Sequence, residues 1–197
     1  MNTVKLKGTI HDIEHSHTIA DMDFNKATVL VSSDNHVDKL NVRFKKFSCP
    51  YQEGDEVSFT GNIRSYSSRL SNGKNKVDLY VFTYFDDSDD ESTNNKVELD
   101  GRICKINSLR TTKSGKYSLH FILANNLIVN EGTKKLNSYI PCIVWDDTAL
   151  ELSKLSINTK LKVTGKLHSR EYIKTLDDGT VEVKTAHECV VDTFEIL

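Results

Sequence analysis

The chain has 197 residues, of which 38 % are hydrophobic and 27 % are charged, and its formal net charge is −2. No stretch approaches the roughly 18 consecutive apolar residues that span a membrane, and the opening residues, MNTVKLKG, contain no apolar signal segment. Composition therefore argues against an integral membrane protein, and we expect a soluble protein of the cytoplasm.

The charge is unevenly distributed along the chain. Residues 1–85 carry 11 Lys and Arg against 10 Asp and Glu, and residues 96–197 carry 15 against 13. Between them, residues 86–95 (DDSDDESTNN) hold five acidic side chains and no apolar one, which is typical of a solvated linker. The alternative is an acidic segment that competes with nucleic acid for a basic groove. The net charge therefore does not exclude a negatively charged partner.

An apolar pattern near the N-terminus recurs in the middle of the chain. In VKLKGTI, residues 4–10, every second residue is apolar or glycine, and VELDGRI repeats this pattern from residue 97. Further along, GNIRS at residues 61–65 parallels GKLHS at residues 165–169. Each is followed by a turn signal, Asn72-Gly73 in the first half and Asp178-Gly179 in the second. A repeat at this spacing predicts two similar domains.

Each half contains about five strand patterns. In the second half they lie at roughly 97–109, 116–128, 138–145, 159–172 and 181–195, with a short helix after the third. This is the element order of the OB-fold, a small Greek-key barrel. We therefore predict an all-β protein with one short helix per unit, built from two tandem OB-folds, each a five-stranded Greek-key barrel. The predicted divisions are an N-terminal OB-fold at 1–85, an acidic linker at 86–95 and a C-terminal OB-fold at 96–197.

The sequence predicts a helix more clearly in the second half than in the first. In the second half Asp146 and Asp147 favour a helix start, because carboxylates suit the free N–H groups of a first turn. Trp145, directly ahead of them, is expected in the core or at the rim of the barrel. The corresponding segment of the first half, KKFSCPYQEGDE, contains Pro50 and Gly54, so a turn or a single helical loop is expected there.

The clearest candidate binding surface lies on the strand predicted at residues 159–172. Alternation by two sends its apolar residues inward. The residues between them face outward and are Lys160, Lys162, Thr164, Lys166, His168, Arg170 and Tyr172. Cations in a row that ends in an aromatic ring suit a phosphate backbone carrying stackable bases. The alternative is an ordinary solvated strand face.

Further candidates lie in loops and strands where OB-folds often hold oligonucleotides. They are Arg110, Lys113, Lys116 and Lys174 in the second half, and Arg43, Arg64 and Tyr66 in the first. A flexible basic loop without a binding role is the alternative for the loop residues.

The sequence contains no recognisable catalytic or metal-binding motif. Cys49, Cys104, Cys142 and Cys189 are far apart and form no Cys-x-x-Cys pair, which is not zinc spacing. The apolar surroundings of Cys104 and Cys142 predict buried, reduced thiols. No H-E-x-x-H helix, Gly-rich phosphate loop or G-x-S-x-G elbow occurs. We therefore expect no metal, no cofactor and no enzymatic activity.

Four segments of the second half follow one family pattern in order. They are NKVELDGRI, RTTKSGKYSLHFILAN, YIPCIVWDDTALELSKL and KVTGKLHSREY. Through them, residues 95–197 resemble bacterial single-stranded DNA-binding proteins, whose fourth strand carries a G-x-L-x-[ST]-R-x-aromatic segment. Here that segment runs from Gly165 to Tyr172, and the family's aromatic near the third strand corresponds to Tyr139. The resemblance implies that Tyr139 and Tyr172 stack on bases.

The first half is similar to the same fold but diverges at this segment. Arg64 corresponds to His168, and Ser68 replaces Tyr172. Its aromatic contact is therefore expected to be shifted to Tyr66 or lost, and we expect the second half to bind more tightly. The whole chain resembles a two-domain version of the family, of the bacterial or phage type.

The resemblance also implies partners. The family assembles four OB-folds around one strand, so two per chain imply a homodimer. Usual members recruit replication and repair enzymes through an acidic C-terminal tip, whereas this sequence ends in VVDTFEIL, the pattern of a last strand. Recruitment through such a tail is therefore not expected.

We predict non-catalytic, largely sequence-independent binding and protection of single-stranded DNA in replication, recombination or repair. Tyrosine stacking and Lys/Arg contacts to phosphates would supply the affinity. RNA is an alternative ligand, because stacking does not distinguish the 2′-OH. A rival from another class is an OB-fold protein-interaction module of a primosome assembly, which would bind a helicase or primase and hold DNA weakly. An OB-fold nuclease would need clustered carboxylates, and the sequence shows no such set.

Overall fold

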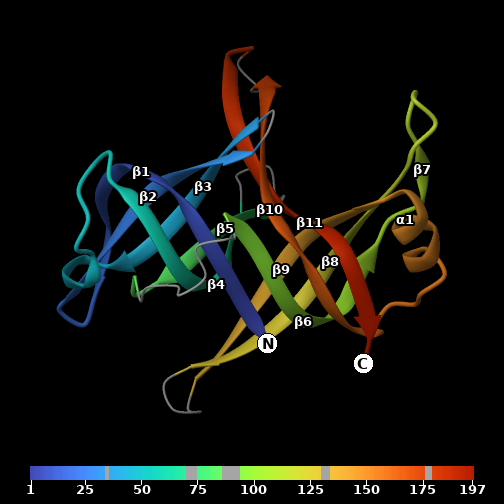
Figure 1. The fold of residues 1–197 in the computed structure, drawn as a ribbon, viewed down its shortest axis with the longest axis horizontal. Helices are drawn as coiled ribbons and strands as arrows, with labels where there is room; N and C mark the ends of the chain where they lie inside the picture. Colours follow the sequence, from blue (N-terminus) through green and yellow to red (C-terminus); the bar gives the residue numbers. More distant parts are fainter. Residues whose placement is uncertain (34–35, 70–74, 86–93, 130–133, 176–178) are drawn as a thin grey trace.

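The computed structural model describes residues 1–33, 36–69, 75–85, 94–129, 134–175 and 179–197, and most of these residues lie in strands (Figure 1). The predicted turn at Asn72-Gly73, Asp178 of the second turn and residues 86–93 of the acidic linker lie outside the described residues. Within the described ranges, no helix is both long and apolar enough to cross a bilayer.

Five strands of the N-terminal half close into a barrel. They are β1 (Asn2–Ile19), β2 (Met22–Ser33), β3 (His36–Lys45), β4 (Glu56–Arg69) and β5 (Asn75–Thr83). Strand β1 pairs antiparallel with both β2 and β4, β2 pairs with β3, and β4 pairs with β5. A parallel pairing of β3 with β5 completes the circle. The order β1-β2-β3-β5-β4 is the Greek-key barrel that the sequence pattern predicts.

The C-terminal half repeats this circle. Its elements are β6 (Asn95–Ile106), β7 (Arg110–Thr111), β8 (Tyr117–Val129), β9 (Lys134–Trp145), α1 (Asp146–Leu152), β10 (Lys160–Thr175) and β11 (Val181–Ile196). Strand β6 pairs with β8 and β10, β8 pairs with β9, β10 pairs with β11, and β11 runs parallel to β9. Both halves therefore share one strand order, and the predicted all-β, OB-fold class is confirmed.

Period-two alternation places the core, as strand β10 illustrates. Leu161 and Val163 are 0 % exposed, whereas Lys160 and Lys166 face solvent. Gly165 lies against β11 so closely that a Cβ atom would overlap the carbonyl oxygen of Val190. Only glycine fits this close approach of two backbones. The inward and outward sets predicted for this strand are therefore those observed.

Equivalent strands of the two halves join them. Strands β1 and β6 pair antiparallel from Asn2↔Leu99 to Leu6↔Asn95. At one end, the side chain of Asn2 donates to the carbonyl oxygen of Ile63 and accepts from its N–H, each at 2.8 Å. At the other end, Asn95 makes the same two bonds with Leu167, at 2.7 and 2.9 Å. The two halves, which repeat in sequence, therefore also make equivalent hydrogen bonds at their junction.

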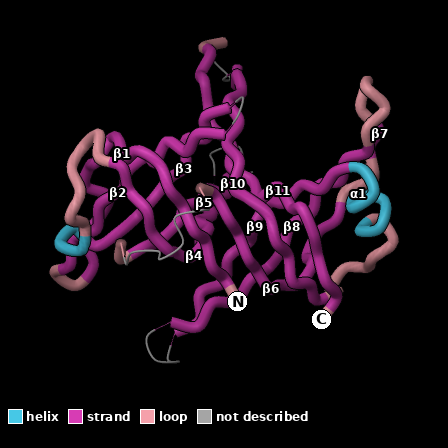
Figure 2. Tube along the Cα trace, in the orientation of Figure 1, coloured by secondary structure: helices cyan, strands magenta, loops and turns pink. Residues whose placement is uncertain are grey.

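The helical segments lie at opposite ends of the molecule (Figure 2). Among the described residues of the first half, the helical segment is the three-residue 3-10 helix Lys46–Ser48, as expected from the proline and glycine nearby. Helix α1 begins at Asp146, with Asp146 and Asp147 in its first turn and Trp145 as the N-cap residue. The α1 segment therefore begins where the acidic pair predicts.

Two local predictions are wrong. Cys142 is buried as expected, but Cys104 is exposed. The inward residues of β6 are Val97, Leu99, Gly101 and Ile103, so alternation by two directs Cys104, the next residue, outward. The strand expected at 97–109 ends at Ile106, and the short strand β7 follows it separately.

Candidate nucleic-acid interface

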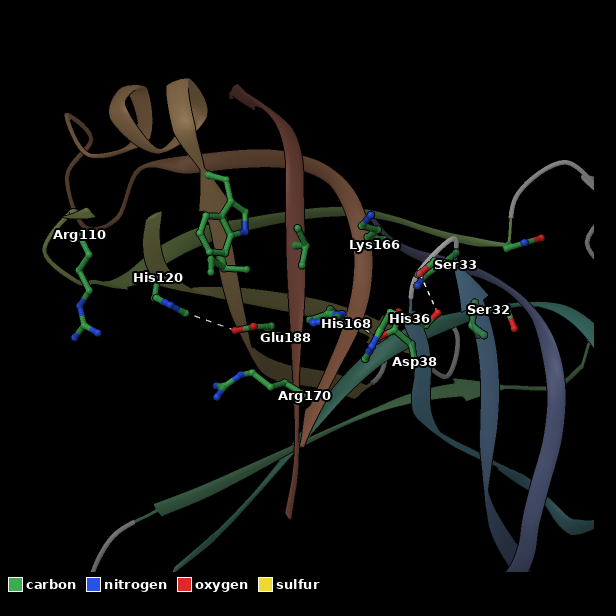
Figure 3. Close-up of a pocket in the computed structure, with 16 residues that line it drawn as sticks. Ser32, Ser33, His36, Asp38, Arg110, His120, Lys166, His168, Arg170 and Glu188 are labelled. Atoms are coloured by element: carbon green, nitrogen blue, oxygen red, sulfur yellow. Dashed lines mark hydrogen bonds and ion pairs between the residues drawn. The ribbon is translucent and has the colours of Figure 1, made fainter. Parts of the chain in front are cut away.

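An open groove of about 1160 Å³ lies where the β2–β3 hairpin of the first half meets strands of the second half (Figure 3). Its lining includes imidazoles from both halves, and cationic and aromatic side chains from the second half. Those that matter below are His36, Arg110, Trp145, Lys166, His168 and Arg170. We call this the main groove. It brings together four of the predicted binding residues, namely Arg110, Lys166, His168 and Arg170.

The cations of the main groove are not neutralised by carboxylates. Within the described part of the chain, no ion pair involves Arg110, Lys166 or Arg170. The groove also contains two carboxylates, and both face imidazoles: Glu188 lies 3.7 Å from Nδ1 of His120, and Asp38 lies 2.9 Å from Nδ1 of His168. Three uncompensated cations remain to attract an anionic ligand.

Trp145 contributes an aromatic surface to the same groove. It is 40 % exposed, ends strand β9 and caps helix α1 with extended backbone angles. The strand and the helix together hold the indole beside the groove instead of within the core. An exposed ring beside uncompensated cations is the combination that stacks on bases of single-stranded nucleic acid.

His168 is engaged in a contact that its sequence position did not reveal. Its Nδ1 lies 2.9 Å from Oδ1 of Asp38, and Nε2 of His36 lies 3.3 Å from the same oxygen. Asp38 also accepts a hydrogen bond of 2.6 Å from the N–H of Ser169. The predicted outward position of His168 is correct, but its imidazole faces a carboxylate of the first half.

A second groove, of about 610 Å³, lies on the first barrel and is rich in aromatic rings. Arg43 lies over the Tyr80 ring at 4.2 Å, and Arg64 lies over the Phe82 ring at 3.8 Å. Tyr84 contacts Phe82 edge to face, with ring centroids 5.3 Å apart. We call this the aromatic groove. It unites the predicted residues Arg43 and Arg64 with rings of strand β5.

Sequence reasoning missed Tyr80, Phe82 and Tyr84. The signal was present, because KVDLYVFTYF places aromatic residues at every second position, and a strand directs such residues to one face. It also missed His36 and assigned Trp145 to the core or the rim. For His36 no local signal exists, since its partner His168 is 132 positions away in the sequence.

Several predicted residues lie outside both grooves. Tyr172 and Lys174 lie in the β10–β11 hairpin, which projects from the body of the molecule (Figure 1), and Tyr172 is 38 % exposed. Lys113 and Lys116 lie in the exposed turn between β7 and β8. Lys162 is on the outward side of β10, opposite Glu195 and Asp100 of the neighbouring strands.

Tyr139 and Tyr66 lie where the two halves touch. The N–H of Tyr139 donates a 2.8 Å hydrogen bond to Oγ of Ser65, so strand β9 contacts β4 at this point. Tyr139 is 46 % exposed, and Tyr66, which follows Ser65, is 56 % exposed. Both predicted rings are thus available at the surface, away from the two grooves.

This chain is similar to one protein family and to solved structures of a single-stranded DNA binding protein. Residues 94–197 match the model of the single-strand binding protein family. No curated protein sequence matches the chain. The wild-type single-stranded DNA binding protein from Thermus aquaticus aligns over 100 % of this chain and 93 % of its own, with a TM-score of 0.72 and 17 % identity. A deletion mutant of that protein aligns over 100 % and 94 %, with a TM-score of 0.73 and 18 % identity. At this identity the likeness shows a shared fold.

Proposed function

This chain belongs to the single-strand binding protein family, whose members bind DNA and do not catalyse a reaction, and from that premise we propose that it coats and protects single-stranded DNA. The proposed settings are replication, recombination and repair. We further propose that residues 1–85 and 96–197 are two OB-fold domains joined by the acidic segment 86–95, and that both contribute to the binding surface.

The main groove is the observation that carries this proposal. Arg110, Lys166 and Arg170 come from two strands, lack ion pairs within the described residues, and flank the half-exposed Trp145. Cations follow a phosphate backbone whatever its sequence, and a stacked base contributes about 1–3 kcal/mol whatever its identity. Binding is therefore largely independent of sequence.

The aromatic groove and the exposed tyrosines extend the proposed track. Arg43 and Arg64 supply cations beside the rings of β5. Tyr66, Tyr139 and Tyr172 are exposed enough for a base to stack on them. Lys113, Lys116, Lys162 and Lys174 add positive charge along the approach of the strand.

Trp145 is the single tryptophan of the chain, so its fluorescence reports on the main groove directly. We expect oligo-dT to quench it at micromolar protein or below, with a salt slope of about −0.7 per neutralised phosphate. A Tyr117→Ala variant removes an exposed ring that lies in neither groove and should bind normally. Unchanged fluorescence together with no salt-sensitive binding in anisotropy would rule the proposal out.

Competition between oligomers of matched RNA and DNA sequence identifies the preferred nucleic acid. We propose DNA as the preferred ligand, because the family match is to single-strand binding proteins and the solved structures of this fold are described as DNA-binding. Equal competition by RNA would broaden the ligand class without changing the site.

A homodimer with four barrels is the proposed assembly, in keeping with the resemblance to a family that surrounds one strand with four OB-folds. Light scattering should give a mass of about twice the 22.3 kDa of the chain. A strict monomer would contradict this part of the proposal while leaving DNA binding intact.

One observation favours a second function, as a protein-interaction module of a replication assembly. The β10–β11 hairpin exposes Ile173, Val181 and Val183, which are 72 %, 61 % and 67 % accessible. Exposed apolar residues that cluster on one projecting element favour a protein contact. Capture of a purified helicase or primase that survives nuclease treatment, with weak DNA affinity, would support this function over the first.

A further inference from the structure

Two histidines and one carboxylate from both halves of the chain converge at the edge of the main groove (Figure 3). His36 and Asp38 come from strand β3, and His168 comes from β10. One ligand atom from each of the three lies within 4.8 Å of the other two. Imidazole nitrogens and a carboxylate oxygen are ligand types that a transition metal takes, and at this range they can converge on one ion.

The charge of Asp38 has no permanent counterpart here. Its side chain is 6 % exposed, and within the described part of the chain no Lys or Arg pairs with it. Its nearest partners are the Ser169 N–H and two imidazoles, which carry charge only when protonated. A buried carboxylate is costly unless it is paired or coordinates a metal. The site therefore gains most from a cation that brings more than one charge.

From this arrangement we propose that His36, Asp38 and His168 bind a divalent transition-metal ion of the Zn²⁺ class. Two imidazole nitrogens and one carboxylate oxygen suit Zn²⁺ better than Mg²⁺ or Ca²⁺, which prefer oxygen ligands alone. Metal–ligand bonds of about 2.0–2.2 Å place tetrahedral ligands roughly 3.3 Å apart. The observed separations of 2.9 and 3.3 Å from Oδ1 of Asp38 to the two imidazole nitrogens already approximate this spacing.

Binding exchanges protons for the metal. Nε2 of His36 also lies 3.1 Å from the carbonyl oxygen of Ser169, a bond that only a protonated nitrogen can donate. Nδ1 of His168 and Nε2 of His36 must both be free of hydrogen to coordinate, so the bond from His36 to Ser169 breaks and protons leave the cluster when the ion enters. The N–H of Ser169 continues to donate to Asp38 and holds its carboxylate in place. Such an outer hydrogen bond orients a metal-binding carboxylate.

An ion bound at this position has two effects on the molecule. It ties β3 of the first barrel to β10 of the second, beside the existing bonds from the N–H of Lys39 to Oγ of Ser169 and from Nζ of Lys39 to Glu171. The three residues also line the main groove, so water or a phosphate oxygen in the groove can complete the coordination. This inference does not depend on DNA binding, because the ion is held by the protein alone.

Isothermal titration of the untagged, chelator-treated full chain with ZnCl₂ tests the site. We expect one ion per chain, proton release, and a rise in the melting temperature. Co²⁺ should give the intense visible absorption of a tetrahedral site. His36→Ala and His168→Ala should each weaken binding by at least about 10-fold, since even outer-shell changes cost this much.

His15→Ala is the matched control, because His15 is an exposed histidine that faces a carboxylate, Asp23, at 3.6 Å elsewhere in the first barrel. It should leave the Zn²⁺ isotherm unchanged. The His36 side chain is 47 % exposed, so its variant should fold even if that of His168 does not. Absence of saturable Zn²⁺ binding would overturn the proposal, as would an isotherm that His36→Ala leaves unchanged.

Discussion

The guanidinium carbon of Arg64 lies 3.8 Å from the centroid of the Phe82 ring, and Nε of Arg64 has no hydrogen-bond partner among the described residues. Burial lowers the pKa of this guanidinium, although arginine stays charged at neutral pH. Arg64 is partly buried, and the lost hydration of its guanidinium and the unpaired Nε destabilise the folded state and offset the attraction to the Phe82 ring. We infer that Arg64 is placed for a ligand of the aromatic groove and not for stability.

Arg64→Met should therefore separate binding from stability. Methionine keeps an apolar contact with the Phe82 ring and removes the buried charge, so the free energy of unfolding should not fall. Single-stranded DNA affinity should fall by about 10-fold, since a charge-assisted hydrogen bond contributes about 1.5–3 kcal/mol. Urea unfolding and anisotropy measure the two quantities. A large loss of stability with normal DNA affinity would show that Arg64 is structural.

The barrels could be predicted from the sequence because their signals are local. Alternation along residues 159–172, the repeated VKLKG and VELDG patterns, and the glycine at a close backbone approach each depend on neighbours in the chain. Such signals also placed Lys166 and Arg170 correctly on the outward face of their strand, whereas Arg110 was predicted beside a turn and lies in the short strand β7. Period-two patterns determine which face a residue occupies.

The composition of the grooves could not be predicted in the same way. His36 meets His168 only because strand β3 packs against β10, a contact between distant parts of the chain. Tyr80, Phe82 and Tyr84 share one face, but which face is open depends on how β5 pairs with β3 and β4. Cys104 was misplaced because apolar neighbours in the sequence do not determine burial: it follows the inward residue Ile103, and alternation directs it outward.

Removal of cations from the main groove should change the salt dependence of DNA binding. Lys166→Ala and Arg170→Ala should each reduce the magnitude of the slope of log K against log salt by about 0.7–1, because each removes a phosphate contact. The measurement is anisotropy with labelled oligo-dT over a range of NaCl concentrations. Lys154→Ala is the control, because this exposed lysine follows α1 and lies in neither groove. An equal change of slope in all three variants would mean that only total charge matters.

Glu53 should contribute stability that depends on pH. Its carboxylate accepts hydrogen bonds from the N–H groups of Asp12, at 2.9 Å, and Ile13, at 3.3 Å, and these bonds hold the pKa of Glu53 below its ordinary value of 4.5. A lowered pKa means that the folded state prefers the charged form, so the stabilisation is present above pH 4.5 and is lost as pH falls through the folded-state pKa.

Glu53→Gln should thus lower the melting temperature at pH 7, and the difference from the unsubstituted chain should shrink as pH falls below about 4.5. Thermal melts followed by circular dichroism between pH 3 and pH 7 measure it. Glu151→Gln removes an equal charge from the exposed end of α1 and is the control for the change in net charge. A Glu53→Gln difference that is constant with pH would contradict the role of its charge.

Asn2 should be a main contributor to the junction between the barrels. The side chain is 4 % exposed, and besides its two bonds to Ile63 it donates to Oδ1 of Asn125 at 2.8 Å. Asn2→Ala leaves these buried groups without partners, each at about 1–3 kcal/mol, so a loss of about 2–4 kcal/mol in the free energy of unfolding is expected. Asn95→Ala breaks the equivalent bonds to Leu167 at a half-buried position, where water can replace them, and should cost less. Urea unfolding of both variants measures the difference, and the exposed Asn137→Ala is the control. Equal losses of unfolding free energy at Asn2 and Asn95 would show that burial does not determine the strength of this junction.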